Sequence, residues 1–159
     1  NSDLVEITFT SNHILFNLKT TKVISRLLEG KFVNYNSLLP QEHKLIVNVK
    51  KQELQNGIER ASLMAKDGNS NLIKLDVQED ILIITSNSQL GKVREEVNIN
   101  LQGEGIQIAF NSRYLLDVLK SMEEEEIVIE LTSSVSPCVI KGKNSNNAKY
   151  LVLPVRLVR

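Results

Sequence analysis

The chain has 159 residues, 42% of them hydrophobic, and its 19 basic side chains balance 19 acidic ones. This length allows one domain and part of another, and zero net charge excludes a protein that holds nucleic acid by bulk positive charge. Cys138 is the only cysteine, which excludes an internal disulfide and a Cys-based zinc site and favours a reducing, cytoplasmic compartment. Since no apolar run approaches the roughly 20 residues of a membrane span, we expect no membrane contact.

The first 40 residues predict the end of one domain and a linker. Residues 4–9, 13–18 and 22–28 alternate as three short strands separated by turn signals. Three strands without a covering helix form a poor independent unit. We therefore assign residues 1–30 to the closing strands of a preceding domain and residues 31–40 to an interdomain linker. The linker mixes Gly, Asn, Ser and Pro with apolar residues, so we expect it to be packed, since free linkers are polar.

Residues 41–159 predict a complete domain that opens with a strand at 45–49 and a helix at 50–66. Leu54, Ile58, Ala61 and Ala65 recur at the spacing of one helix face. Strands are expected at 72–77, 81–85 and 93–101.

The same pattern then starts again with a strand at 106–110 and an N-cap signal at Asn111-Ser112. A helix is expected over 112–122 and strands over 127–131, 137–141 and 149–153. The two helices start about 61 residues apart, and self-similarity at a fixed period indicates a repeated architecture. We predict an α+β fold of repeated β-α-β-β-β units, with two helices packed on antiparallel sheets, and expect the chain to be a fragment of a longer repeat protein.

The C-terminal segment stays apolar after its last strand is broken by Pro154. Val155, Leu157 and Val158 follow the proline, whereas loose termini are usually polar. Two alternatives stay open: a tail that is docked in a groove or lines one, or a last strand with a fraying end.

Catalytic and metal-binding patterns are not found. His13 and His43 have no cysteine or carboxylate at metal-ligand spacing and are expected to be surface or filler residues. The run 123–126 consists of four glutamates and is expected to be a solvated helix end. We therefore expect no enzyme activity, no cofactor and no metal.

Four segments, in order along the chain, resemble the bacterial DNA polymerase III beta sliding clamps. They are SRLLEGKFVNY with LLP (25–35 and 38–40), FNSRYLLDVL (110–119), LTSSVSP (131–137) and YLVLPVRL (150–157). The resemblance implies the DNA-clamp fold, with the end of the second domain followed by the third. Three departures are Val33 and Ser37 in the linker, where the family often has Pro and Arg, and an extension by Val158 and Arg159.

The resemblance also implies a function. Such clamps are homodimeric rings of three-domain protomers that encircle duplex DNA without sequence preference and act as non-catalytic processivity factors. Their partners are the DNA polymerase III alpha subunit, the clamp loader and other proteins that carry a Gln/Leu/Phe-type peptide. The alternative is a β-rich peptide-binding module without DNA contact; a hydrolase or nuclease lacks a plausible residue set.

Transferred position by position, the resemblance implies three sets of residues. The partner-peptide pocket would comprise Val33, Leu38, Asn111, Tyr114, Val135, Pro137, Leu151, Leu153, Pro154, Val155 and Arg156. DNA-facing cations would be Lys51, Arg60, Lys66, Arg113 and Lys120. Leu63 and Met64 lie off the core face of the first predicted helix and would contact the other protomer.

Overall fold

The computed structural model describes residues 4–40, 42–67, 71–89, 91–145 and 147–156, except for the side chains of Lys66 and Asp67. The chain divides into two compact units, Asn1–Asn34 and Tyr35–Arg159. The division falls within the segment 31–40 expected as a linker, and each unit is described by itself.

The first unit is a three-stranded antiparallel meander. It contains β1 (Glu6–Phe9), β2 (His13–Leu18) and β3 (Thr21–Arg26), in the order β1-β2-β3. Ile7, Phe9 and Ile24 stay exposed, as expected for a small sheet with no helix of its own to cover it.

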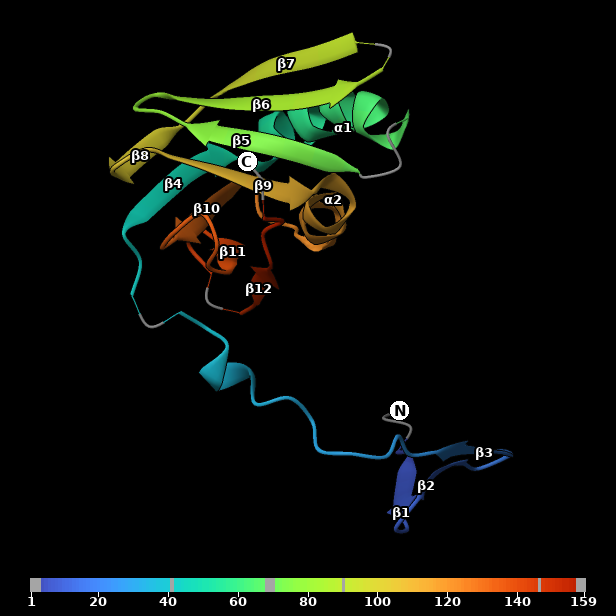
Figure 1. Ribbon diagram of the computed structural model, residues 1–159. Coiled ribbons are helices and arrows are strands. Elements are labelled where there is room, and N and C mark those ends of the chain that lie inside the picture. Colours follow the sequence, from blue (N-terminus) through green and yellow to red (C-terminus); the bar gives the residue numbers. More distant parts are fainter. Residues whose placement is uncertain (1–3, 41, 68–70, 90, 146, 157–159) are drawn as a thin grey trace. The chain divides into compact units, whose positions relative to one another are not determined.

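In its described residues, the second unit contains two α-helices and two antiparallel sheets (Figure 1). A short 3₁₀ helix, η1 (Tyr35–Ser37), precedes β4 (Leu45–Lys50), α1 (Lys51–Asp67), β5 (Leu72–Val77), β6 (Ile81–Ser88), β7 (Gly91–Asn98), β8 (Asn100–Gly103), β9 (Ile106–Asn111), α2 (Ser112–Ser121), β10 (Glu126–Leu131), β11 (Cys138–Gly142) and β12 (Lys149–Val152). The five-stranded sheet has the order β12-β11-β10-β4-β8, and the four-stranded sheet has the order β7-β6-β5-β9. The predicted α+β class and the repetition of a strand, a helix and further strands are confirmed.

The core lies between the helices and the two sheets. α1 packs against β5, β6, β7 and α2, and α2 also contacts β9 and β12. The predicted core face of α1, formed by Leu54, Ile58, Ala61 and Ala65, is fully buried. Side chains from both sheets close the same core, among them Val47 and Ile129 from one sheet and Ile84 and Ile108 from the other.

One predicted strand is wrong, because residues 93–101 form parts of two strands in different sheets. β7 pairs with β6, whereas β8 pairs with β4. Ile99 is the residue between them, and its amide donates to the carbonyl of Asp80 at 3.1 Å. Apolar residues alternate at Val97, Ile99 and Leu101, across the change from β7 to β8, so period-2 alternation could not reveal the change of sheet.

A buried carboxylate is a second feature that the sequence reading missed. Glu130 of β10 is only 6% exposed, and its two oxygens lie 3.0 Å from Nε2 of His43 and 2.5 Å from Nζ of Lys141. His43 is therefore not a mere surface or filler residue. Thr132 Oγ1 donates to the Glu42 carbonyl at 2.7 Å, so the chain entering β4 is held against the end of β10.

Candidate functional site

The segment after β12 is docked on the neighbouring sheet. Val155 donates its backbone N–H to the carbonyl of Ala109 in β9 at 2.8 Å. Since β9 is an edge strand of the four-stranded sheet and β12 an edge strand of the five-stranded one, this segment links the two sheets. Of the two alternatives for the tail, this hydrogen bond favours docking at Val155, whereas the side chains of Leu153 and Arg156 stay exposed.

A groove of about 490 Å³ lies beside this contact. Its walls come from β5, β9, the loop before β11 and the tail, and it is lined by Lys74, Gln107, Ile108, Ala109, Ser134, Val135, Val155 and Arg156. Three of these, Val135, Val155 and Arg156, belong to the predicted peptide pocket. Lys74 and Gln107 were missed because they lie on segments that the sequence marks only as strands.

The start of α2 lies close to the docked tail. Asn111 caps the helix, with its side-chain oxygen accepting from the amide of Arg113 at 3.0 Å. The side-chain oxygen of Asn111 is used in this cap. Its side-chain nitrogen is therefore the group that can donate a hydrogen bond to a ligand. Asn111 follows Ala109 by two residues, about 7 Å along the strand. Tyr114, in the first turn of α2, is 60% exposed.

Other predicted pocket residues lie at the end of β12. Leu151 pairs with Val139, and Val152 pairs with Cys138, so Pro137 and Leu153 follow at the same end of this strand pair. Leu153 is 65% exposed, and Val135 is 59% exposed, although both are large apolar side chains. Leu38, after η1, is 48% exposed. Pro154 is half-buried, and Val33 belongs to the first unit, so its role stays a prediction.

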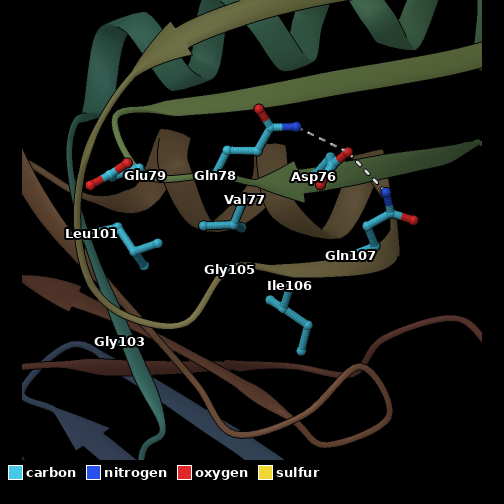
Figure 2. Close-up of a pocket in the computed structure, with 9 residues that line it drawn as sticks. All are labelled: Asp76, Val77, Gln78, Glu79, Leu101, Gly103, Gly105, Ile106 and Gln107. Atoms are coloured by element: carbon cyan, nitrogen blue, oxygen red, sulfur yellow. Dashed lines mark hydrogen bonds between the residues drawn. The ribbon is translucent and has the colours of Figure 1, made fainter.

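A second pocket, of about 580 Å³, contains none of the predicted site residues. Figure 2 shows Gln107 and Gln78 both turned toward the carboxylate of Asp76, to which their amide nitrogens donate at 2.9 Å and 3.5 Å. Gly105 lines the same pocket, and a Cβ there would lie 2.3 Å from the Val77 carbonyl. Of the two acids that line this pocket, Asp76 and Glu79, Asp76 is thus already hydrogen-bonded within the protein.

The predicted DNA-facing cations are largely engaged within the protein. Lys51 donates from Nζ to the carbonyl of Met122 at 2.7 Å, at the end of α2. Arg60 donates to Glu95 through Nε at 2.9 Å and through Nη2 at 2.6 Å, which holds the pKa of Glu95 below its usual value. Arg113 is exposed. The side chain of Lys66 lies outside the described residues.

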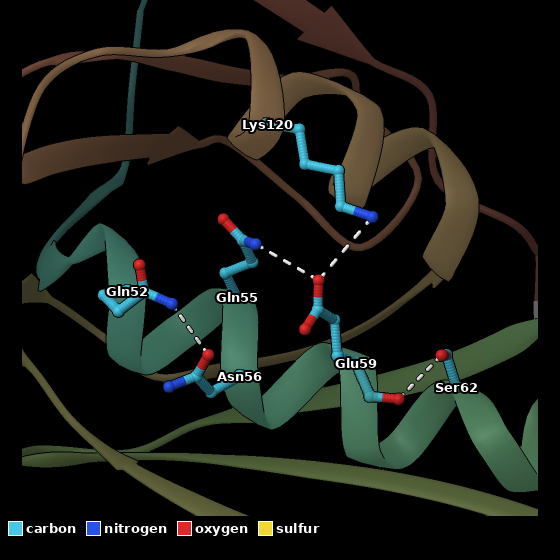
Figure 3. Close-up of polar contacts among 6 residues, drawn as sticks. All are labelled: Gln52, Gln55, Asn56, Glu59, Ser62 and Lys120. Atoms are coloured by element: carbon cyan, nitrogen blue, oxygen red, sulfur yellow. Dashed lines mark hydrogen bonds and ion pairs between the residues drawn. The ribbon is translucent and has the colours of Figure 1, made fainter.

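A polar stripe runs along α1 opposite its buried face. Figure 3 shows Gln52 beside Asn56, and Glu59 between Gln55 and Lys120 of α2. The amide of Gln55 donates to Glu59 at 3.1 Å, and Nζ of Lys120 lies 3.6 Å from the same carboxylate. The surface shared by the two helices is therefore rich in uncharged amides.

Leu63 and Met64 differ in exposure. Leu63 is 65% exposed, whereas Met64 is half-buried and its sulfur lies 3.8 Å from the hydroxyl of Ser88. Leu63 is thus the larger apolar surface, and its role at an interface stays a prediction.

Comparison with known proteins identifies the family. The family model described as "DNA polymerase III beta subunit, C-terminal domain" matches residues 36–156. The chain belongs to the DNA polymerase III beta subunit family.

Two relatives extend the match over almost the whole chain. The beta sliding clamp of Staphylococcus aureus is 35% identical over 158 residues, 98% of this chain and 42% of that protein. The clamp of Staphylococcus epidermidis is 34% identical over 154 residues, 96% of this chain and 41% of that protein. The chain thus spans about two fifths of the length of these beta sliding clamps.

Solved beta subunits share the fold. The sliding clamp of Bacillus subtilis is 36% identical with a TM-score of 0.88, covering 97% of this chain and 41% of that one. The beta chain of Streptococcus pneumoniae is 30% identical with a TM-score of 0.90, covering 96% and 41%. The DNA-clamp architecture predicted for this beta-subunit chain is confirmed.

Within the described part of this beta-subunit chain, neither helix combines the length and hydropathy needed to cross a bilayer. In the same residues, no three side chains among His, Cys, Asp and Glu gather as a metal site would require.

Proposed function

We propose that this chain is part of a ring-shaped sliding clamp, a processivity factor that encircles duplex DNA, tethers the replicative polymerase and docks partner proteins. In this proposal the clamp is homodimeric, cytoplasmic and non-catalytic. Its partners are the DNA polymerase III alpha subunit, the clamp loader and other proteins with a Gln/Leu/Phe-type peptide. Membership in the beta subunit family supports this proposal.

The observation that carries peptide docking is the set of exposed apolar side chains at one end of the second unit. Tyr114, Val135, Leu153 and Val155 are all exposed although large and apolar. They come from three separate segments, namely α2, the loop before β11 and the tail, and the Val155–Ala109 hydrogen bond holds the tail against the strand that leads into α2. An apolar surface with a few polar groups for orientation is typical of peptide recognition.

Titration of a fluorescent Gln/Leu/Phe-type peptide onto the chain tests this pocket. Replacing Tyr114 with Ala removes an exposed ring from the proposed contact and should weaken binding about tenfold or more. Replacing Tyr35 with Ala is the matched control, because both tyrosines are 60% exposed and Tyr35 is outside the proposed pocket. Equal affinity of the wild type and the Tyr114→Ala variant would remove the pocket assignment.

DNA contact is proposed for the surface shared by α1 and α2. Its amide-rich stripe and the Glu59–Lys120 pair suit loose contact with phosphates, which carries no sequence information. Glu59→Gln should remove the ion pair with Lys120, so that Lys120 can contact a phosphate. The slope of log DNA affinity against log salt concentration should then become more negative by about one. An unchanged slope would remove Lys120 from the DNA-facing set.

The ring is tested with an intact clamp that carries this chain. A closed ring should stay on circular duplex DNA and slide off after the circle is cut. A β-rich module that binds only peptides would show no such difference. Leu63→Ala should weaken ring closure if Leu63 contacts the other protomer, and analytical ultracentrifugation measures this.

A further inference from the structure

We propose that the groove along β9 binds an acidic, extended segment of the partner peptide by strand addition, with Lys74 and Arg156 as its charge partners. The proposal rests on the peptide-docking function above. It adds Lys74 and Gln107 to the site and specifies the chemistry of the ligand.

The backbone of β9 offers an open edge beside this groove. β9 is the last strand in its sheet, and Ala109 lies opposite Lys74 in the antiparallel pair with β5. The Ala109 carbonyl points away from β5, because it accepts from Val155 at 2.8 Å. Since alternate residues of a strand turn their backbone groups to the same edge, Gln107 presents its N–H and C=O to the groove as well.

The chain itself shows that this edge can pair with an extended segment. Val155 follows Pro154 and donates to this edge, and both Val155 and Gln107 line the groove. Val135 is exposed across from them, so a side chain of an added strand would meet an apolar wall. Strand addition of this kind takes its affinity from main-chain hydrogen bonds and its specificity from alternate side chains.

The charge of the groove determines which peptide it suits. Lys74 and Arg156 line it, whereas its eight lining residues include no acid. Asp76, on the same face of β5 as Lys74, accepts from the neutral amides of Gln107 and Gln78, so two cations stand against one carboxylate in and beside the groove. The groove therefore favours an aspartate or glutamate in the added strand. Duplex DNA is the less suitable anion, because it has neither a strand edge to pair with β9 nor an apolar group to pack on Val135.

The experiment compares fluorescent Gln/Leu/Phe-type peptides that carry two aspartates, at one end or the other, with the same peptides carrying two asparagines. Anisotropy titration at low salt should show at least one aspartate peptide binding about three- to tenfold tighter than its asparagine match. Lys74→Gln and Arg156→Gln should each reduce that preference about threefold. Lys92→Gln is the control, because Lys92 is an exposed lysine on β7 of the same sheet.

The outcomes separate this inference from the peptide pocket itself. Equal binding of aspartate and asparagine peptides overturns the inference and leaves the pocket standing. A preference that Lys74→Gln and Arg156→Gln leave unchanged also overturns it. Failure of all the peptides to bind refutes both proposals. Displacement of the aspartate peptide by duplex DNA, lost in the Lys74→Gln variant, would instead make the groove a phosphate site.

Discussion

Replacing Leu153 with Ala gives a direct measure of the apolar contact in the proposed pocket. Leu153 follows β12 and is 65% exposed, so its side chain contributes little to the folded core. A partner peptide that covers it would bury about two thirds of a leucine side chain. At about 25 cal/mol per Å², this burial is worth about 1–2 kcal/mol.

The substitution should therefore weaken a Gln/Leu/Phe-type peptide about five- to thirtyfold, since 1.4 kcal/mol is a factor of ten. The free energy of unfolding should change by less than about 0.5 kcal/mol, because the removed atoms are mostly in solvent. Fluorescence anisotropy measures the dissociation constant, and urea unfolding measures the stability.

Leu63→Ala is the matched control. Leu63 is also 65% exposed, but it lies on α1 rather than in the proposed pocket. Its replacement should leave peptide affinity unchanged. If both variants bind the peptide as tightly as the wild type, or if both weaken it equally, exposure of Leu153 does not reflect a binding site.

Three further predictions concern stability and reactivity. Gly103→Ala should lower the free energy of unfolding by about 2–4 kcal/mol in urea titration. Gly103 has φ +104°, and a Cβ there would lie 2.3 Å from the Lys44 carbonyl. Gly91→Ala is the control and should lower the free energy of unfolding by less, because open space surrounds Gly91. Arg60 lowers the pKa of Glu95 from its ordinary 4.5 through a hydrogen bond. The pair therefore stabilises the fold fully above pH 4.5, and this stabilisation is lost as the pH falls through the lowered pKa. The stability difference between wild type and Glu95→Gln should thus shrink in acid unfolding, and a pH-independent difference would contradict this. Burial and the negative charge of Glu130 raise the pKa of the Cys138 thiol, so a thiol reagent should label Cys138 only after unfolding in urea, and rapid labelling of the native chain would refute this.

The groove that we propose for strand addition at β9 could not be predicted from the sequence. Lys74 and Gln107 lie in segments whose alternation indicates only strands, and nothing local shows which strand forms a sheet edge. The groove forms because the tail crosses from the end of β12 to Ala109. Glu130 carried a weak signal, as a charge inside the apolar run 127–131. Its partners His43 and Lys141 lie on other segments, and no local sequence pattern indicates that they contact Glu130.

The amino-acid sequence by itself determined the repeated pattern of strands and helices, the core face of α1, the N-cap at Asn111 and the resemblance to the clamp family. These features depend on the spacing of neighbouring residues, which the amino-acid sequence gives directly. Only the tertiary structure decided where the alternating run at 93–101 changes sheet, which cations are already paired, and that the tail docks on β9. Each of these depends on contacts between residues far apart in sequence, where side-chain packing and hydrogen bonding select one arrangement among several that the local pattern allows.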